Sequence, residues 1–140
     1  MLRISLHLFN AVEATNRGQV LSSPVDVELA PNVIVQPDVV VVLNEGSEKI
    51  QESRIIGTPD LVVEVASPST RGFDRRLKQD AYARAGVPEY WIVNLQESVV
   101  EVYSDLAQGS YQSVRHVGRG ETLVLPEGLS GEVAVDDILG

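Results

Sequence analysis

The sequence predicts an α/β protein in which helices flank a central mixed sheet. Segments with the two-residue period of strands alternate with segments of helical period along its 140 residues. The segment from Val39 to Leu43 is apolar and almost entirely β-branched, as in strands that are covered on both faces. A helical segment joins two such strands, which implies a right-handed crossover between parallel neighbours. The length suits one core, so we expect a single domain over residues 1–140.

The first third of the chain is expected to supply a helix and two strands. Apolar residues from Leu2 to about Asn16 fit an amphipathic helix, and Gly18 then favours a stop. Residues 25–29 alternate between apolar and polar side chains, which predicts a half-buried strand. Turn-forming residues at 30–32 separate this strand from the one that begins at Val39.

A loop and a third strand follow. The segment from Asn44 to Thr58 is polar, so we expect a loop there, with a helical turn around Lys49 to Arg54. The segment from Asp60 to Ala66 is again β-branched and is predicted to be a buried strand. The strands at 25–29, 39–43 and 60–66 are expected to form an antiparallel meander.

The clearest helix is predicted from Asp74 to Ala85. Asp74 is a suitable N-cap, and Gly86 favours a stop. Leu77, Ala81 and Ala85 recur at helical spacing and form its apolar stripe.

Further strands are expected after this helix. The first should lie parallel to strand 60–66, and the later ones should be hairpin-like. Their predicted bounds are Glu89 to Val93, Val99 to Tyr103, Tyr111 to Val117 and Thr122 to Leu125.

Composition excludes several functional classes. With 44% hydrophobic and 22% charged residues the chain is not a disordered tail, and no apolar run approaches the roughly 18 residues of a membrane span. The absence of cysteine removes disulfides, thiolate nucleophiles and Cys-ligated zinc. The net charge of −9 repels phosphate backbones, so any contact with nucleic acid must be local. The N-terminus is a poor match to a signal peptide, and we expect a cytoplasmic protein without membrane association.

A carboxylate inside an apolar strand is the first indication of a site. Glu64 lies within VVEVA, where a buried charge is costly unless a metal cation, a basic side chain or backbone donors compensate it. Asp38 opens the preceding strand directly after Pro37. If these strands pair, both carboxylates can meet at one point of the sheet, and two hard oxygen ligands suit magnesium or manganese.

Plainer interpretations of the acids remain open. Pro-Asp is a common turn pair, so Asp38 is also compatible with a purely structural start of a strand. The second Pro-Asp pair makes Asp60 another candidate for the first acid. Asp60 lies about 13 Å from Glu64 along the same strand, too far for both to bind one ion easily. We therefore interpret Asp60 as a turn residue.

Basic residues gather on and before the helix from Asp74. Five of the eleven lysines and arginines fall within fourteen positions, at Arg71, Arg75, Arg76, Lys78 and Arg84. Lys78 lies one turn after Asp74, where its ammonium could reach the edge of the sheet. Ser69 could donate a hydrogen bond to a phosphate, although capping is the commoner role of such serines. A solvated helix surface is the plainer interpretation of the basic residues.

Four segments carry a resemblance to a known family. They are QPDVVVV from Gln36, PDLVVEVASPSTR from Pro59, the Asp74 to Lys78 spacing followed by YARAGVPEYWIVN, and VEVY from Val100. With the intervening residues they cover about two thirds of the chain. The combination resembles Uma-type endonucleases, a branch of the PD-(D/E)XK restriction-endonuclease-like superfamily.

The resemblance implies a restriction-endonuclease-like core that hydrolyses phosphodiester bonds with a metal ion. By motif, Asp38, Glu64 and the main-chain carbonyl of Val65 would bind Mg²⁺, with Mn²⁺ as an alternative. A lysine would position or activate the attacking water. The superfamily places that lysine at the position of Ala66, and Lys78 looks like its relocated substitute. The residues expected to contact nucleic acid are Ser69, Arg71, Arg75 and Arg76.

The leading hypothesis is therefore a Mg²⁺-dependent endonuclease that cleaves DNA as a homodimer, because nicking both strands needs two sites. Members of the family usually have an N-terminal extension before the first helix, which this chain is expected to lack. The alternative is an inactive, shortened member that serves as a binding or assembly module. An unrelated acidic β-rich interaction domain is a third hypothesis, which the carboxylate at Glu64 disfavours.

Overall fold

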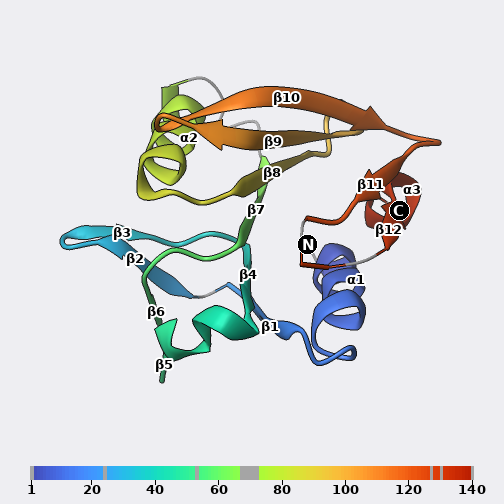
Figure 1. Ribbon diagram of the computed structural model, residues 1–140. Helices are drawn as coiled ribbons and strands as arrows, with labels where there is room; N and C mark the ends of the chain where they lie inside the picture. The colour runs from blue at the N-terminus through green and yellow to red at the C-terminus, as the bar shows by residue number, and fades with distance from the viewer. Residues whose placement is uncertain are drawn as a thin grey trace.

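A computed structural model describes residues 2–23, 25–52, 54–66, 73–126, 128–129 and 131–139. Its centre is a six-stranded sheet in the order β1-β4-β7-β8-β9-β10 (Figure 1). The bounds of these strands are Gly18–Ser22, Val39–Leu43, Leu61–Ala66, Glu89–Asn94, Val99–Ala107 and Ser110–Gly118. Strands β7 and β8 are parallel and the other neighbours are antiparallel, so the sheet is mixed, as predicted.

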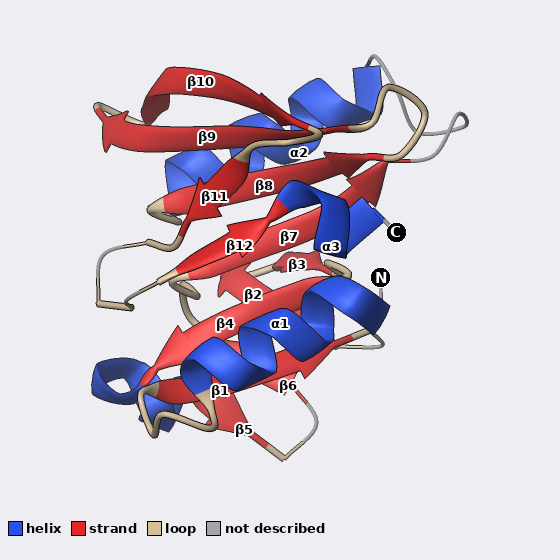
Figure 2. Ribbon diagram, turned by 90° about the vertical axis from the view of Figure 1, so that its right-hand side faces the viewer, coloured by secondary structure: helices blue, strands red, loops and turns tan. Residues whose placement is uncertain are grey.

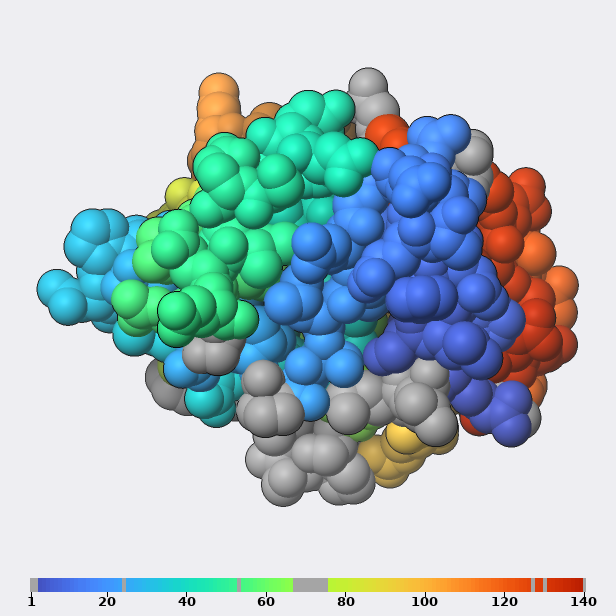
Figure 3. Space-filling model, turned by 90° about the horizontal axis from the view of Figure 1, so that it is seen from below, coloured from blue at the N-terminus to red at the C-terminus, as the bar shows by residue number. Residues whose placement is uncertain are grey.

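One face of the large sheet is covered by both ends of the described chain (Figure 2). The covering elements are α1 (Leu2–Val12), β11 (Thr122–Val124), β12 (Glu132–Ala134) and α3 (Val135–Leu139). Helix α1 lies beside the C-terminal segment (Figure 3). The core on this side surrounds Trp91, which is completely buried with Leu8 and Val63.

The opposite face is covered by α2 and a second, four-stranded sheet. Helix α2 (Phe73–Ala85) connects β7 to β8 and makes the predicted crossover. The second sheet has the order β3-β2-β6-β5, with bounds Val33–Val35, Asp26–Ala30, Arg54–Ile56 and Ile50–Gln51. The core on this side contains Val27, Ile55 and Tyr82, all fully buried.

Strand β4 shows why a continuous apolar run forms here. Val39 and Val41 belong to one core, whereas Val40 and Val42 belong to the other. Because successive side chains of a strand point to opposite faces, a strand buried on both sides needs apolar residues at every position. The predicted double coverage is confirmed.

The strand predicted at residues 25–29 is present, but its predicted place in the meander is wrong. This segment forms β2 (Asp26–Ala30) in the second sheet, where β2 is parallel to β6. Strand β4 pairs antiparallel with β7, as predicted, but its other antiparallel neighbour is β1, with Gln19 opposite Val42. An alternating pattern indicates that one face of a strand is buried, but it does not indicate which strand is its neighbour in the sheet.

Several shorter elements also differ from the predictions. Helix α1 ends at Val12, four residues before the predicted end. The segment expected to be a loop contains a 3₁₀ helix at Asn44–Lys49 and strands β5 and β6, so the helical turn lies earlier than predicted. Strands β1, β3 and β12 and helix α3 were not predicted. No helix in the described part of the chain is long and apolar enough to cross a membrane.

Candidate active site

The two predicted acids lie on neighbouring strands. Strands β4 and β7 pair antiparallel with Val39 opposite Val63, and one further step of this register places Asp38 opposite Glu64. Opposed residues of an antiparallel pair project from the same face of the sheet. For Asp38 and Glu64 this is the face covered by α2, since Val40 and Val62 on the same side belong to the core around Tyr82.

Asp38 is bound to the backbone of β7. Its Oδ2 accepts a hydrogen bond of 2.7 Å from the main-chain N–H of Val65. The second Pro-Asp pair makes the matching contact at the other end of these strands, where Oδ2 of Asp60 accepts a bond of 2.8 Å from the N–H of Leu43. Both acids therefore satisfy a backbone donor of the partner strand. Among the described residues, no hydrogen bond to the Oδ1 atom of Asp38 is found.

Glu64 is buried and held by two donors. Only 8% of the residue is exposed. Its Oε1 is 2.8 Å from the ammonium of Lys78, and its Oε2 accepts a hydrogen bond of 2.6 Å from the hydroxyl of Tyr82. A lysine was one of the compensating groups that the sequence predicted for this charge. The tyrosine was not predicted.

Helix α2 supplies both donors. Lys78 and Tyr82 are four residues apart, which places them on one face of a helix. The predicted apolar stripe is wrong in one respect, because Leu77 is 49% exposed whereas Tyr82 and Ala83 are buried. This face of α2 lies against the sheet. There Lys78 and Tyr82 supply the hydrogen-bond donors that the buried carboxylate of Glu64 requires and that an aliphatic stripe would lack.

Burial raises the pKa of the Tyr82 hydroxyl far above its ordinary value, and the charge of Glu64 and its hydrogen bond raise it further. Tyr90 and Asp38 make smaller contributions to the same rise. The contribution of Asp38 is consistent with its position on the same face as Glu64. Tyr82 therefore keeps its proton and acts as a hydrogen-bond donor.

A stack of tyrosines extends from this site across the sheet. The rings of Tyr82 and Tyr90 lie 4.9 Å apart, and those of Tyr90 and Tyr103 lie 5.6 Å apart. The hydroxyl of Tyr103 donates a bond of 3.0 Å to Oε1 of Glu101, a second buried carboxylate. The sequence signal for Tyr82 is its spacing of four residues from Lys78, which apolar periodicity does not reveal.

The carboxylate oxygens of Asp38 and Glu64 are ligands of the kind that a small hard cation prefers. Among the described residues no three His, Cys, Asp or Glu side chains are grouped to hold a metal. Mg²⁺, however, is usually held by one or two carboxylates and completes its shell with water and substrate phosphates. An ionised carboxylate has about four acceptor positions, so Glu64 can accept from Lys78 and Tyr82 and still bind a cation. Asp38 and Glu64 are the two carboxylates of this face that could hold such an ion.

The predicted contacts to nucleic acid are only partly within the described residues. Arg76 lies on α2 and is exposed. Ser69 and Arg71 lie outside the described residues, as does the side chain of Arg75.

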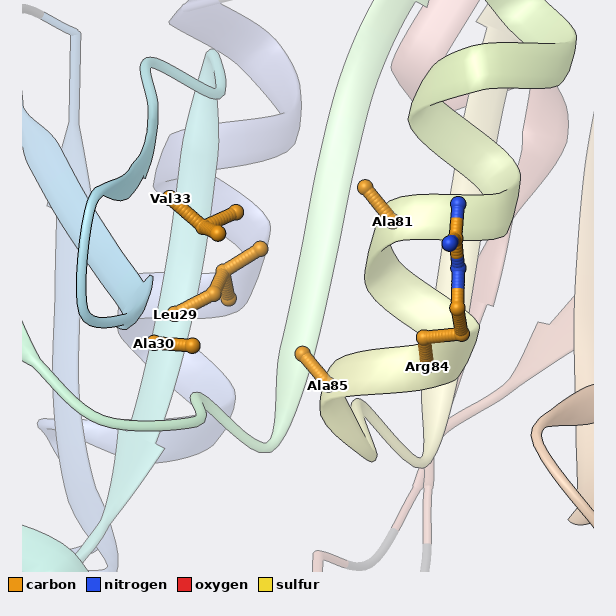
Figure 4. A pocket seen from close by; sticks show the side chains of 6 residues that line it. All are labelled: Leu29, Ala30, Val33, Ala81, Arg84 and Ala85. Atoms are coloured by element: carbon orange, nitrogen blue, oxygen red, sulfur yellow. The ribbon is translucent and has the colours of Figure 1, made fainter.

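The apolar hollow beside α2 is separate from these acids. It has a volume of about 280 Å³ and lies between α2 and the strands β2 and β3 (Figure 4). Its lining residues are Leu29, Ala30, Val33, Ala81, Arg84 and Ala85. It contains no carboxylate, so it does not provide the chemistry of the candidate site.

Comparison with known proteins identifies the class of the fold. A crystal structure of "a putative nuclease belonging to DUF820" from Anabaena variabilis matches with a TM-score of 0.79 and 15% sequence identity. The match covers 99% of this chain and 76% of that chain. The chain thus has a restriction-endonuclease-like fold.

The family follows from the sequence. Residues 2–136 match the family model of Uma2, described as "Putative restriction endonuclease". The chain belongs to the Uma2 family, as its motifs predicted. No curated protein matches it.

Proposed function

We propose that this chain is a metal-dependent endonuclease that hydrolyses phosphodiester bonds of DNA, with Mg²⁺ as the ion and Mn²⁺ as a substitute. One observation carries this proposal. Asp38 and Glu64 stand opposite each other on neighbouring strands, and the ammonium of Lys78 is 2.8 Å from Glu64. Membership of a nuclease family supports the reaction class.

Asp38, Glu64 and the carbonyl of Val65 would hold the ion. The N–H of Val65 points to Asp38, and in an extended strand the carbonyl of a residue lies on the same side as its N–H. A bound divalent ion supplies polarisation of the phosphate and a water of lowered pKa.

Lys78 contributes a positive charge beside the carboxylates. Its side chain is 37% exposed, so the ammonium binds Glu64 at the boundary with solvent. There it can orient the attacking water and offset negative charge that develops on phosphate oxygens. Two acids without this cation would repel the phosphate.

DNA would approach over the N-terminal half of α2. The proposed contacts are Ser69, Arg71, Arg75 and Arg76. Cleavage of both strands requires two sites, so we propose a homodimer, acting in the cytoplasm.

A second candidate function is an inactive binding or assembly module. It is favoured by one observation, that both oxygens of Glu64 already have protein donors while no group of three metal-ligating side chains occurs among the described residues. In that case the ion pair would simply neutralise a buried charge.

The two Pro-Asp pairs provide a matched test. Asn retains an oxygen that accepts a backbone hydrogen bond but loses the charge, so Asp38→Asn and Asp60→Asn should both fold. We expect Mn²⁺ to raise the melting temperature of the wild-type protein and of Asp60→Asn, because a ligand of the folded state stabilises it by mass action. Asp38→Asn should lose this shift.

Cleavage of a supercoiled plasmid in Mg²⁺ completes the test. We expect activity in the wild type and in Glu101→Gln, and none above background in Glu64→Gln. Glu101 is the control because it is also buried and bound by a tyrosine. A wild-type protein with neither a Mn²⁺ shift nor cleavage would contradict the nuclease proposal and favour the module.

A further inference from the structure

The hydrogen bond between Tyr82 and Glu64 is short and buried. At 2.6 Å it lies in the range of O–H donors to ionised carboxylates, which are stronger than neutral hydrogen bonds. Tyr82 has no exposed surface, so water does not compete for its hydroxyl. This bond links α2 to β7 at the residue that the proposed function requires as a metal ligand.

Glu64 needs such a restraint to present its oxygens in one direction. The terminal torsion of a glutamate is broad and roughly two-fold, so an unrestrained carboxylate plane rotates. Lys78 holds Oε1 and Tyr82 holds Oε2, which gives one donor to each oxygen. Of these two donors, the lysine is long and partly exposed, whereas the tyrosine is rigid and enclosed.

The tyrosine ring is itself fixed in place. It packs against Tyr90, which is 1% exposed and stacks on Tyr103. The ring of Tyr82 therefore has little freedom to follow Glu64 into another orientation.

We propose that Tyr82 is a positioning residue for Glu64: its hydroxyl fixes the plane of the carboxylate and thereby the direction from which Glu64 can bind a divalent cation. The inference rests on the proposed function, because the restraint on Glu64 matters for catalysis only if Glu64 binds a metal ion. Tyr82 touches neither substrate nor ion and acts through Glu64 alone.

Removal of one oxygen atom tests the inference. Tyr82→Phe retains the ring in its stack, and Tyr103→Phe is the matched control because it also removes a buried tyrosine–carboxylate bond. We expect the Kd for Mn²⁺, measured by calorimetry, to rise about tenfold or more in Tyr82→Phe, in line with other groups that orient metal ligands. The Kd should change less than about twofold in Tyr103→Phe. With plasmid as substrate, kcat should fall in Tyr82→Phe while KM is unchanged.

A measurement without metal separates this inference from the proposed function. In the wild-type protein the Tyr82 hydroxyl proton should be protected from exchange and give a downfield NMR signal. In the spectrum of Glu64→Gln that signal should disappear or move upfield. In the spectrum of Glu101→Gln it should persist. This measurement needs no Tyr82 variant, so it remains decisive if Tyr82→Phe does not fold.

The outcomes are distinct. An unchanged Mn²⁺ Kd in folded Tyr82→Phe overturns the inference, and so does a wild-type protein without the protected proton. If the wild type binds no Mn²⁺ at all, the proposed function fails, and the proton signal still decides whether Tyr82 holds Glu64.

Discussion

At the scale of single residues, each acid of the interior is compensated in its own way. Glu64 has a lysine and a tyrosine, and Glu101 has a tyrosine. Glu89 accepts a hydrogen bond of 2.7 Å from the indole N–H of Trp91. Burial nevertheless raises the pKa of Glu89, although the bond from Trp91 and the charge of Arg115 lower it in part. Glu89 is thus an acid whose charged form is unfavourable in the folded protein.

The raised pKa of Glu89 predicts that the stability of the folded protein depends on pH. Because the folded protein binds the Glu89 proton more tightly than the unfolded chain, the contribution of Glu89 to stability is present at low pH and is lost as the pH rises. The loss should begin near the ordinary pKa of about 4.5 and continue through the raised folded value.

Glu89→Gln should therefore gain stability relative to the wild type as the pH increases. The measurement is the melting temperature of both proteins from about pH 4 to about pH 8. Glu97→Gln, at an exposed position, is the control. A constant difference between Glu89→Gln and the wild type across this range would contradict the assignment.

At the scale of elements, α2 and β1 show how local sequence and neighbours combine. Helix α2 was predicted from an N-cap at Asp74, which lies one residue inside the helix, and from its spacing and stop, but the side that it buries carries Tyr82, which donates to Glu64 on β7. Strand β1 is half-exposed and lacks a run of β-branched residues. Its position depends on close contact with β4 at Gly18, where a Cβ atom would lie 2.3 Å from the carbonyl oxygen of Val42.

This contact predicts that Gly18→Ala weakens the pairing of β1 with β4. The obstacle is backbone, which cannot move aside as a flexible side chain can, so we expect a loss of about 1–3 kcal/mol in the free energy of unfolding. Gly118→Ala is the control, since the nearest atom to its Cβ would be 3.6 Å away at the end of a side chain. Urea denaturation measures both. Equal losses in the two variants would exclude the steric explanation.

At the scale of the whole molecule, the proposed DNA-binding surface differs from the rest of the protein in its charge. The chain has a net charge of −9, yet five of its eleven basic residues lie between positions 71 and 84. DNA can approach such a protein only where the basic side chains outweigh the overall repulsion. The proposed binding should therefore depend strongly on orientation and on salt.

Arg76→Ala tests this surface. If Arg76 contacts a phosphate, its loss should weaken DNA binding about equally for all sequences and reduce the slope of log K against log salt by about 1. Arg3→Ala is the control, because Arg3 is exposed on α1, which covers the opposite face of the sheet. Fluorescence anisotropy at several salt concentrations gives both slopes. Equal slopes for Arg76→Ala and the wild type would show that Arg76 does not contact a DNA phosphate.

The sequence by itself determined the class of fold, the family and the elements with strong local signals. Strands β4, β7 and β8 were predicted because their burial is recorded in consecutive apolar residues, as in Val39–Leu43, and helix α2 was predicted from its helical spacing and its stop at Gly86. Four segments, two of which contain Asp38 and Glu64, predicted the family that the match to Uma2 confirms. The placement of both acids on one face followed from the predicted pairing of the second and third strands.

Only the tertiary structure decided which strand lies beside β4, that residues 25–29 join a second sheet, and that Tyr82 binds Glu64. These features depend on contacts between residues far apart in the chain. A periodic pattern indicates which face of an element is buried, because hydrophobicity is a property of each residue's own side chain. It does not report the partner, because the partner is chosen by the free energy of the whole packed arrangement.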